Sequence, residues 1–158
     1  LLRMELDPSI QAVGVFVNEL PQIVAGYLED GIIDLAQLHG QEDETYIHHL
    51  RLLTGQPLIK AFSIRTAEDL ADAEESSADL ILLDHGSGGT GECFDWQLLH
   101  TVRRPYLLAG GITPENAEEA VRTYRPYGLD VSSGVETDGK KDAKKIMEIV
   151  RRIRNAER

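Results

Sequence analysis

The stretch Leu107-Leu108-Ala109-Gly110-Gly111 decides the fold of this chain, together with its counterpart Leu129-Asp130-Val131-Ser132-Ser133-Gly134. Each is an apolar run that ends in a turn of small residues and precedes a sequence that favours a helix. Such a unit suits an anion, because a backbone without Cβ atoms can approach a ligand and the first N–H groups of a helix point at it. Two such turns on consecutive units predict one phosphate held between them by Gly110, Gly111, Ser133 and Gly134.

Four apolar runs earlier in the chain form, with these two, a repeat of strand–helix units. Strands are predicted to start near residues 12, 35, 58, 80, 105 and 129, and segments with helical spacing of apolar residues lie between them. Apolar strands that alternate with amphipathic helices predict an α/β fold with a parallel sheet. An open doubly wound sheet is possible, but the even spacing and the candidate site residues at strand ends favour a TIM (β/α)8 barrel.

The same spacing, continued backwards from residue 12, predicts two more strands ahead of Leu1. The chain is therefore expected to hold six of the eight βα units, strands 3 to 8, in a single domain over residues 1–158 that is incomplete at its N-terminus. Residues 1–8 would be the end of a helix. A barrel that lacks two strands would have two sheet edges and an opened core.

The charge balance narrows the class of ligand. Lys and Arg total 16 against 27 Asp and Glu, which gives a net charge of −11, so general binding to nucleic acid or to an anionic membrane is not expected. An anionic ligand must be bound locally, by backbone dipoles or a few cations. The single cysteine, Cys93, rules out an internal disulfide and suits a reducing compartment, so a cytoplasmic location is expected. No apolar run approaches the roughly 20 residues of a membrane span.

Two carboxylates are the main candidates for chemistry. Asp84 ends a Leu-Ile-Leu-Leu strand at the face where barrels carry their active sites, and a carboxyl group in apolar surroundings can donate a proton near neutral pH. A turn or N-cap aspartate is an equal alternative. Asp130 is predicted inside the sixth strand, where a charge needs a partner. It would bind a substrate hydroxyl or form a structural ion pair.

A glycine-rich loop over residues 86–91 follows the fourth strand and includes Gly88 and Gly89. It could close over a substrate or be a plain connector, and it matches neither the P-loop nor the dinucleotide fingerprint. Cys93 is not favoured as a nucleophile, and no histidine has metal-ligand spacing. Lys140 and Lys141 are expected to be solvated surface residues.

Several motifs occur in a recognisable order. They are Val13-Gly14-Val15-Phe16-Val17-Asn18, Gln37-Leu38-His39-Gly40, Leu82-Leu83-Asp84, Gly88-Gly89-Thr90-Gly91 with Phe94-Asp95-Trp96, Leu108-Ala109-Gly110-Gly111-Ile112 with Pro114-Glu115-Asn116, and Asp130-Val131-Ser132-Ser133-Gly134-Val135-Glu136 with Gly139-Lys140-Lys141-Asp142. From the first residue to the last helix, the chain resembles phosphoribosylanthranilate isomerase, a (β/α)8-barrel family of tryptophan biosynthesis.

The resemblance implies an Amadori rearrangement of N-(5-phosphoribosyl)anthranilate to 1-(2-carboxyphenylamino)-1-deoxyribulose 5-phosphate, with no metal and no organic cofactor. It implies that Asp84 is the general acid and that Asp130 binds a sugar hydroxyl. The two turns would hold the substrate phosphate, and the loop with Gly88 and Gly89 would close over the site. The expected partner is a small phosphosugar, bound by a monomer or homodimer.

One departure from the family pattern concerns the general base. The family has a cysteine in a Lys-Ile-Cys-Gly motif after its first strand and an arginine after its second, and residues 1–158 match neither segment. This chain alone is therefore expected to be inactive. The alternative is a truncated, non-catalytic phosphosugar-binding barrel fragment. A third reading, a barrel such as indole-glycerol-phosphate synthase, needs lysines at strand ends, whereas Lys60 is predicted within a strand.

Overall fold

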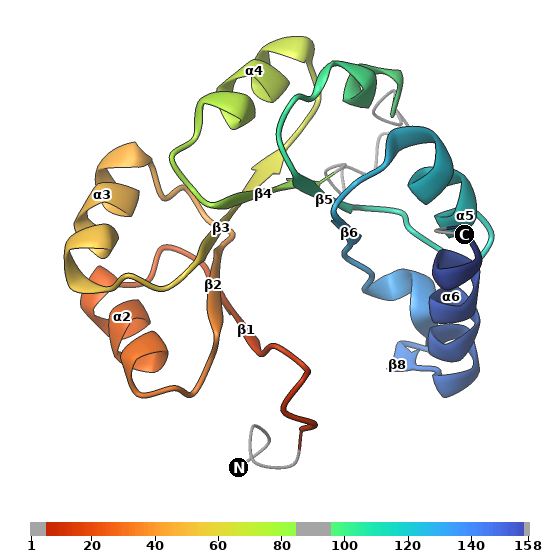
Figure 1. Ribbon diagram of the computed structural model, residues 1–158, viewed down its shortest axis with the longest axis horizontal. Coiled ribbons are helices and arrows are strands. Elements are labelled where there is room, and N and C mark those ends of the chain that lie inside the picture. The colour runs from red at the N-terminus through yellow and green to blue at the C-terminus, as the bar shows by residue number, and fades with distance from the viewer. Residues whose placement is uncertain (1–5, 85–95, 157–158) are drawn as a thin grey trace. The chain divides into compact units, whose positions relative to one another are not determined.

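The computed structural model describes residues 6–84 and 96–156. The chain divides into two compact units, the first made of residues 1–62 and 75–81 and the second of residues 63–74 and 82–158. Six strands follow one another in one sheet in chain order, β1 to β6, and β7 pairs with β8 in a separate two-stranded sheet (Figure 1).

The elements of the first half of the chain are β1 (Val13–Phe16), α2 (Pro21–Glu29), β2 (Leu35–Leu38), α3 (Glu44–Leu53), β3 (Leu58–Ser63), α4 (Ala67–Glu75) and β4 (Leu80–Asp84). Those of the second half are η1 (Trp96–Thr101), β5 (Tyr106–Ala109), α5 (Ala117–Glu119), η2 (Ala120–Tyr124), β6 (Gly128–Leu129), η3 (Ser133–Val135), β7 (Glu136–Thr137), β8 (Lys140–Lys141) and α6 (Ala143–Ala156). The pairs β1–β2, β2–β3 and β5–β6 are parallel, as predicted.

The prediction of a TIM (β/α)8 barrel, of which this chain holds strands 3 to 8, is wrong. The structure has a six-stranded sheet in which β1 is the first strand and β6 the last. Each of the six strands corresponds to an apolar run, whereas the two further strands were extrapolated from the repeat and correspond to no residues of the sequence. Repeat spacing reflects the length of one strand, turn and helix, and it does not fix how many strands a sheet contains.

The predicted helix end over residues 1–8 is also wrong where the structure describes it, from residue 6 on. The Asp7 carboxylate accepts hydrogen bonds from the Ser9 N–H (2.9 Å) and hydroxyl (2.7 Å). An aspartate whose side chain accepts a hydrogen bond from the residue two positions later forms a turn. The residue before a proline, here Asp7, also disfavours the helical backbone conformation. Pro8 and Ser9 therefore make this segment a turn.

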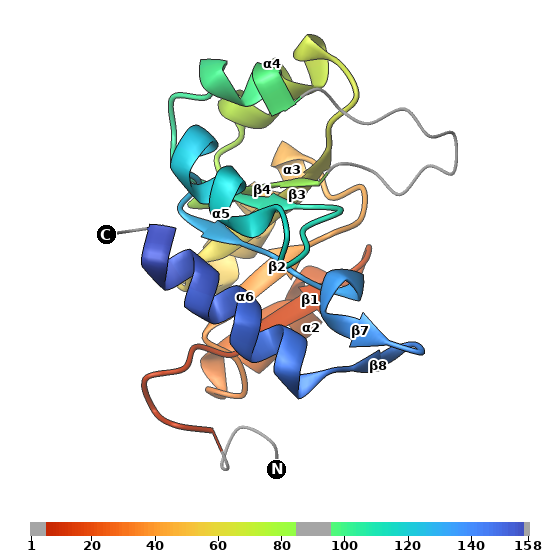
Figure 2. The same ribbon diagram turned by 90° about the vertical axis from the view of Figure 1, so that its right-hand side faces the viewer.

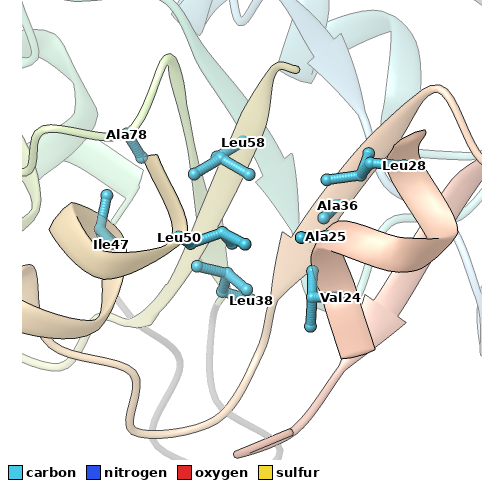
Figure 3. Close-up of a cluster of buried hydrophobic side chains, with 9 residues drawn as sticks. All are labelled: Val24, Ala25, Leu28, Ala36, Leu38, Ile47, Leu50, Leu58 and Ala78. Carbon is cyan, nitrogen blue, oxygen red and sulfur yellow. The ribbon is translucent and has the colours of Figure 1, made fainter. Parts of the chain in front are cut away.

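The first unit has its own hydrophobic core, in which side chains of α2 and α3 pack against β2 and β3 (Figure 3). Val24 and Leu28 contribute from α2, and Ile47 and Leu50 contribute from α3. These four residues lie on the helix faces predicted to be apolar. The full cluster is Val24, Ala25, Leu28, Ala36, Leu38, Ile47, Leu50, Leu58 and Ala78.

The sequence predicts an N-cap at Thr66, because Asp69 follows three residues later, and the structure confirms it. The Asp69 N–H donates to the Thr66 hydroxyl (3.2 Å), and the Thr66 N–H donates back to the Asp69 carboxylate (2.8 Å). This reciprocal pair satisfies two N–H groups that have no partner inside the helix, so α4 begins at the next residue, Ala67.

A buried ion pair, which the sequence did not predict, ties the middle of β3 to the loops that follow β1 and β2. Lys60 Nζ lies 3.2 Å from the Glu42 carboxylate, and the two side chains are 6% and 1% exposed. Lys60 also donates to the Gly40 carbonyl (2.8 Å). Glu42 accepts from the N–H groups of Asn18 (2.6 Å) and Gly40 (2.8 Å). The pair thus holds the two loops that follow β1 and β2.

Replacement of Lys60 by methionine would leave the Glu42 carboxylate buried without its cation. We expect Lys60→Met to lower the free energy of unfolding by about 3–5 kcal/mol, measured by urea denaturation. The matched control is Arg122→Met, which removes an exposed pair with Glu118 and should cost about 0.5 kcal/mol or less. Equal effects of the two substitutions would contradict a structural role for the buried pair.

The same pair makes stability depend on pH. Burial alone would raise the pKa of Glu42, but hydrogen bonds from the Asn18 N–H and from Lys60 outweigh it, and the pKa lies below the usual value for glutamate. A lowered folded-state pKa stabilises the fold above the unfolded pKa of about 4.3, and this contribution is lost as the pH falls through the folded-state pKa. We therefore expect the stability advantage of the native chain over Glu42→Gln, measured by denaturation at pH 7 and below pH 4, to shrink in acid. A constant advantage would contradict the assignment.

Candidate functional site

The first glycine turn follows β5 and has a backbone that only glycine adopts easily. Gly110 and Gly111 have φ values of 80° and 67°, which cost a residue with a Cβ atom roughly 1–2 kcal/mol. The Asn116 amide closes the turn, since it donates to the Gly111 carbonyl (2.9 Å) and accepts from the Thr113 N–H (2.8 Å). Two glycines and one amide side chain therefore fix the backbone conformation of this loop.

The helix after this turn begins later than predicted. The sequence predicts Thr113 as the N-cap and Pro114 as the first helical residue, but α5 begins at Ala117. The Thr113 carbonyl accepts the Ala117 N–H (3.0 Å), so its backbone opens the helix instead of its hydroxyl. The side chain of Asn116 accepts the Thr113 N–H, and this hydrogen bond keeps residues 114–116 in a turn.

The second turn follows β6, which ends one residue before Asp130. Asp130 is exposed, and its N–H donates to the Leu108 carbonyl (2.9 Å). The prediction that Asp130 lies inside the strand, where its charge would be costly, is therefore wrong. The small residues after it, Ser133 and Gly134, form the short helix η3 with Val135.

The two turns meet backbone to backbone at Gly134. A Cβ atom at this position would lie 1.8 Å from the carbonyl oxygen of Ile112 and 2.9 Å from its carbonyl carbon, closer than any side chain can pack. Glycine is therefore required at position 134 because a side chain would clash with the Ile112 backbone, and not because of its φ value. The structure thus brings together the two stretches that the sequence singled out, 110–112 and 133–134.

Asp84 is the last residue of β4, which precedes β5 in the order of the sheet. Its side chain is half-buried, and its carbonyl accepts the Ile64 N–H (3.0 Å). The two turns follow the ends of β5 and β6, so Asp84, Asp130 and both turns belong to the carboxyl ends of three consecutive strands. Figure 1 labels these strands β4, β5 and β6. Gly88, Gly89 and Cys93 lie outside the described residues.

Lys141 also belongs to this region. Lys140 and Lys141 are both exposed, as predicted, but Lys141 also makes specific contacts. Its ammonium donates to the carbonyl of Ser132 (2.9 Å) and to the carboxylate of Glu136 (2.7 Å). The hairpin β7–β8 brings it there, with its turn at Asp138 and Gly139. Asp-Gly between two extended segments is a strong hairpin signal, and it could have indicated this return of the chain.

Comparison with known proteins identifies the family. A family model described as N-(5'phosphoribosyl)anthranilate (PRA) isomerase matches residues 4–152. The chain belongs to the phosphoribosylanthranilate isomerase family. The enzyme named N-(5'-phosphoribosyl)anthranilate isomerase of Endomicrobium trichonymphae is 45% identical over 157 residues, which cover 97% of this chain and 77% of the relative.

Solved structures of phosphoribosylanthranilate isomerases agree with this membership. The enzyme of Thermotoga maritima aligns with a TM-score of 0.82 and 33% identity, over 96% of this chain and 77% of its own. A second isomerase structure, in complex with reduced 1-(o-carboxyphenylamino)-1-deoxyribulose 5-phosphate, has a TM-score of 0.80 and 33% identity, over 96% of this chain and 75% of its own. Within residues 6–84 and 96–156, no helix is both long and apolar enough to cross a membrane.

Substitution of Gly134 tests the contact between the turns. We expect Gly134→Ala to lower the free energy of unfolding by about 1–3 kcal/mol, because the added methyl group must push apart two backbone segments. The measurement is urea denaturation, and Gly26→Ala is the control. Nothing lies within 4 Å of a Cβ atom at Gly26, and alanine inside α2 should stabilise by roughly 0.5–1 kcal/mol. A neutral Gly134→Ala would contradict the backbone contact.

Proposed function

We propose that this chain acts in the Amadori rearrangement of N-(5-phosphoribosyl)anthranilate to 1-(2-carboxyphenylamino)-1-deoxyribulose 5-phosphate, in tryptophan biosynthesis. Membership of the isomerase family supports the reaction class. The observation that carries the proposal within the chain is the backbone contact between Gly134 and Ile112, which joins two glycine turns into one anion-binding element. A cytoplasmic location is part of the same proposal, since it suits a biosynthetic enzyme with a lone cysteine.

The phosphate of the substrate binds between the turns in this proposal. Gly110 and Gly111 leave the first loop without Cβ atoms, and Ser133 and Gly134 begin the short helix of the second. Backbone N–H groups in such loops bind phosphate through directed dipoles. This mode of binding suits a chain with a net charge of −11, which has few cations to spare for an anion.

The proton chemistry begins at Asp84. Protonation of the furanose ring oxygen by this carboxyl group opens the ring to a Schiff base. A general base must then accept the C2′ proton, which gives an enolamine that becomes the aminoketose; the scheme assigns this base to no residue of the chain. Every atom of the substrate is kept, and no electron acceptor is required, so acid and base groups suffice for the reaction. Asp84 supplies the acid step in this scheme.

Asp130 binds a hydroxyl group of the sugar in the same proposal. Its backbone is fixed by the hydrogen bond to the Leu108 carbonyl (2.9 Å), and its carboxylate is exposed beside the start of the second turn. An exposed carboxylate with a fixed backbone can accept a hydrogen bond from a sugar without the cost of burying a charge. Asp130 would thus orient the ribose, while the turns hold its phosphate.

The experiment measures turnover as the loss of anthranilate fluorescence from the substrate, and it measures binding of the reduced product analogue by titration calorimetry. We expect Asp84→Asn to lower kcat by about 10²–10⁴-fold and to change analogue affinity little. Asp72→Asn, an exposed residue of α4, is the matched control and should change neither quantity.

Two other results have definite meanings. Analogue binding without turnover by the native chain would support the alternative function, a non-catalytic phosphosugar-binding protein. It is also the result expected from the unmatched cysteine segment, whereas the predicted effect of Asp84→Asn on kcat requires that the native chain turns the substrate over. Turnover that survives Asp84→Asn unchanged would contradict the role of Asp84 as the general acid.

A further inference from the structure

A small hairpin returns the chain to the second glycine turn. β7 and β8 pair antiparallel, with Glu136 opposite Lys141, and the turn residues Asp138 and Gly139 have φ values of 52° and 74°. Two consecutive positive φ values are typical of the tight turns whose twist suits a hairpin. Figure 2 shows the hairpin directly before the start of α6. The pairing places Lys141 next to the loop at Ser132, nine residues earlier.

The Lys141 ammonium makes one hydrogen bond for each of its three N–H groups. It donates to the Ser132 carbonyl (2.9 Å), to the Ser132 hydroxyl (3.3 Å) and to the Glu136 carboxylate (2.7 Å). An ammonium has three N–H donors, so all the donors of Lys141 are engaged by Ser132 and Glu136. An exposed ion pair of this kind contributes little to stability, and its effect on the conformation of the loop is the more important one.

The bond to the Ser132 carbonyl orients the next N–H group. A peptide unit is planar and trans, so the N–H of Ser133 points opposite to the carbonyl of Ser132. That carbonyl accepts hydrogen bonds from the Lys141 ammonium at 2.9 Å and the Val135 N–H at 3.3 Å, so Lys141 is the closer of the two groups that fix it and, with it, the direction of the Ser133 N–H. Lys141 thereby acts on a backbone donor of the proposed phosphate loop without contacting the phosphate.

A second contact holds the same loop from the helix that follows. The Asp142 N–H donates to the Val135 carbonyl (2.8 Å), and the Asp142 carboxylate accepts the Lys144 N–H (2.8 Å). A hydrogen bond from Thr137 and one from the Lys144 N–H lower the pKa of Asp142. The end of η3 is thus tied to the residue that precedes α6. Lys141 holds the other end of η3 through its contact with Ser132.

We propose that Lys141 is a positioning residue for phosphate binding, which acts by holding the Ser132 carbonyl so that the Ser133 N–H faces the phosphate. The inference rests on the proposed function of the two turns. Glu136 neutralises most of the charge of Lys141, so the effect on affinity comes from the direction of a backbone donor and not from added positive potential.

The test compares two ligands, the reduced product analogue and the same compound without its phosphate, by titration calorimetry. We expect Lys141→Met to weaken binding of the phosphorylated analogue roughly tenfold, the usual effect of one hydrogen bond, and to leave the affinity for the dephosphorylated compound unchanged. Lys141→Arg should restore most of the affinity, because a guanidinium can donate to the same carbonyl. Lys140→Met removes the same charge one residue away and should have no effect.

Each other outcome rejects the inference, and the native chain shows whether the proposed function fails with it. If the native chain does not prefer the phosphorylated analogue, both fail. If it does and Lys141→Met binds equally well, only the role of Lys141 fails. Equal loss for both ligands, with a lowered melting temperature, would mean that Lys141 only supports the fold. A matching loss in Lys140→Met would mean that net charge is responsible.

Discussion

The close approach of Gly134 to the Ile112 carbonyl is the constraint on which the rest of the site depends. The 1.8 Å that separates a hypothetical Cβ atom from the carbonyl oxygen leaves room for a hydrogen atom only. Such an approach requires that β5 and β6 end at the same level. The register supplies this condition, since Leu108 is opposite Leu129 and the Asp130 N–H continues the ladder to Leu108. The sheet thus brings the two turns into contact.

Much of the fold could be predicted because strands and helices leave periodic patterns. The runs at residues 35, 58 and 80 coincide with the starts of strands, and β4 has the predicted bounds Leu80–Asp84. The α2 and α3 faces that were expected to be apolar form a core. The six strands of this chain were predicted, whereas the two further strands of a (β/α)8 barrel were wrong because they came only from extrapolation of the spacing. Asp130 was placed inside a strand because the apolar run Leu129-Asp130-Val131 continues past the end of β6 at Leu129.

The site could be predicted in part, for a related reason. The glycine turns and Asp84 are local features, since each follows an apolar strand along the sequence. Other contacts are not visible in the sequence, because they form only when the fold brings separate parts of the backbone within reach. These are the contacts of Asn116, of Lys141, and of the pair of Glu42 with Lys60. Lys141 and Lys140 are adjacent and chemically identical in the sequence, and only the hairpin distinguishes them. Polar residues with such partners leave no periodic pattern.

The two turns are held by the same kind of contact, which would let an acidic chain bind phosphate in the way proposed above. A side chain from later in the sequence holds one carbonyl in each turn, the Asn116 amide at Gly111 and the Lys141 ammonium at Ser132. Since peptide units are planar, the following N–H groups are fixed in direction before a ligand arrives. Donors that need no reorganisation interact more strongly with an anion than mobile ones. Binding by fixed backbone dipoles therefore removes the need for a cluster of positive side chains, which a chain with 27 acidic and 16 basic residues would tend to neutralise.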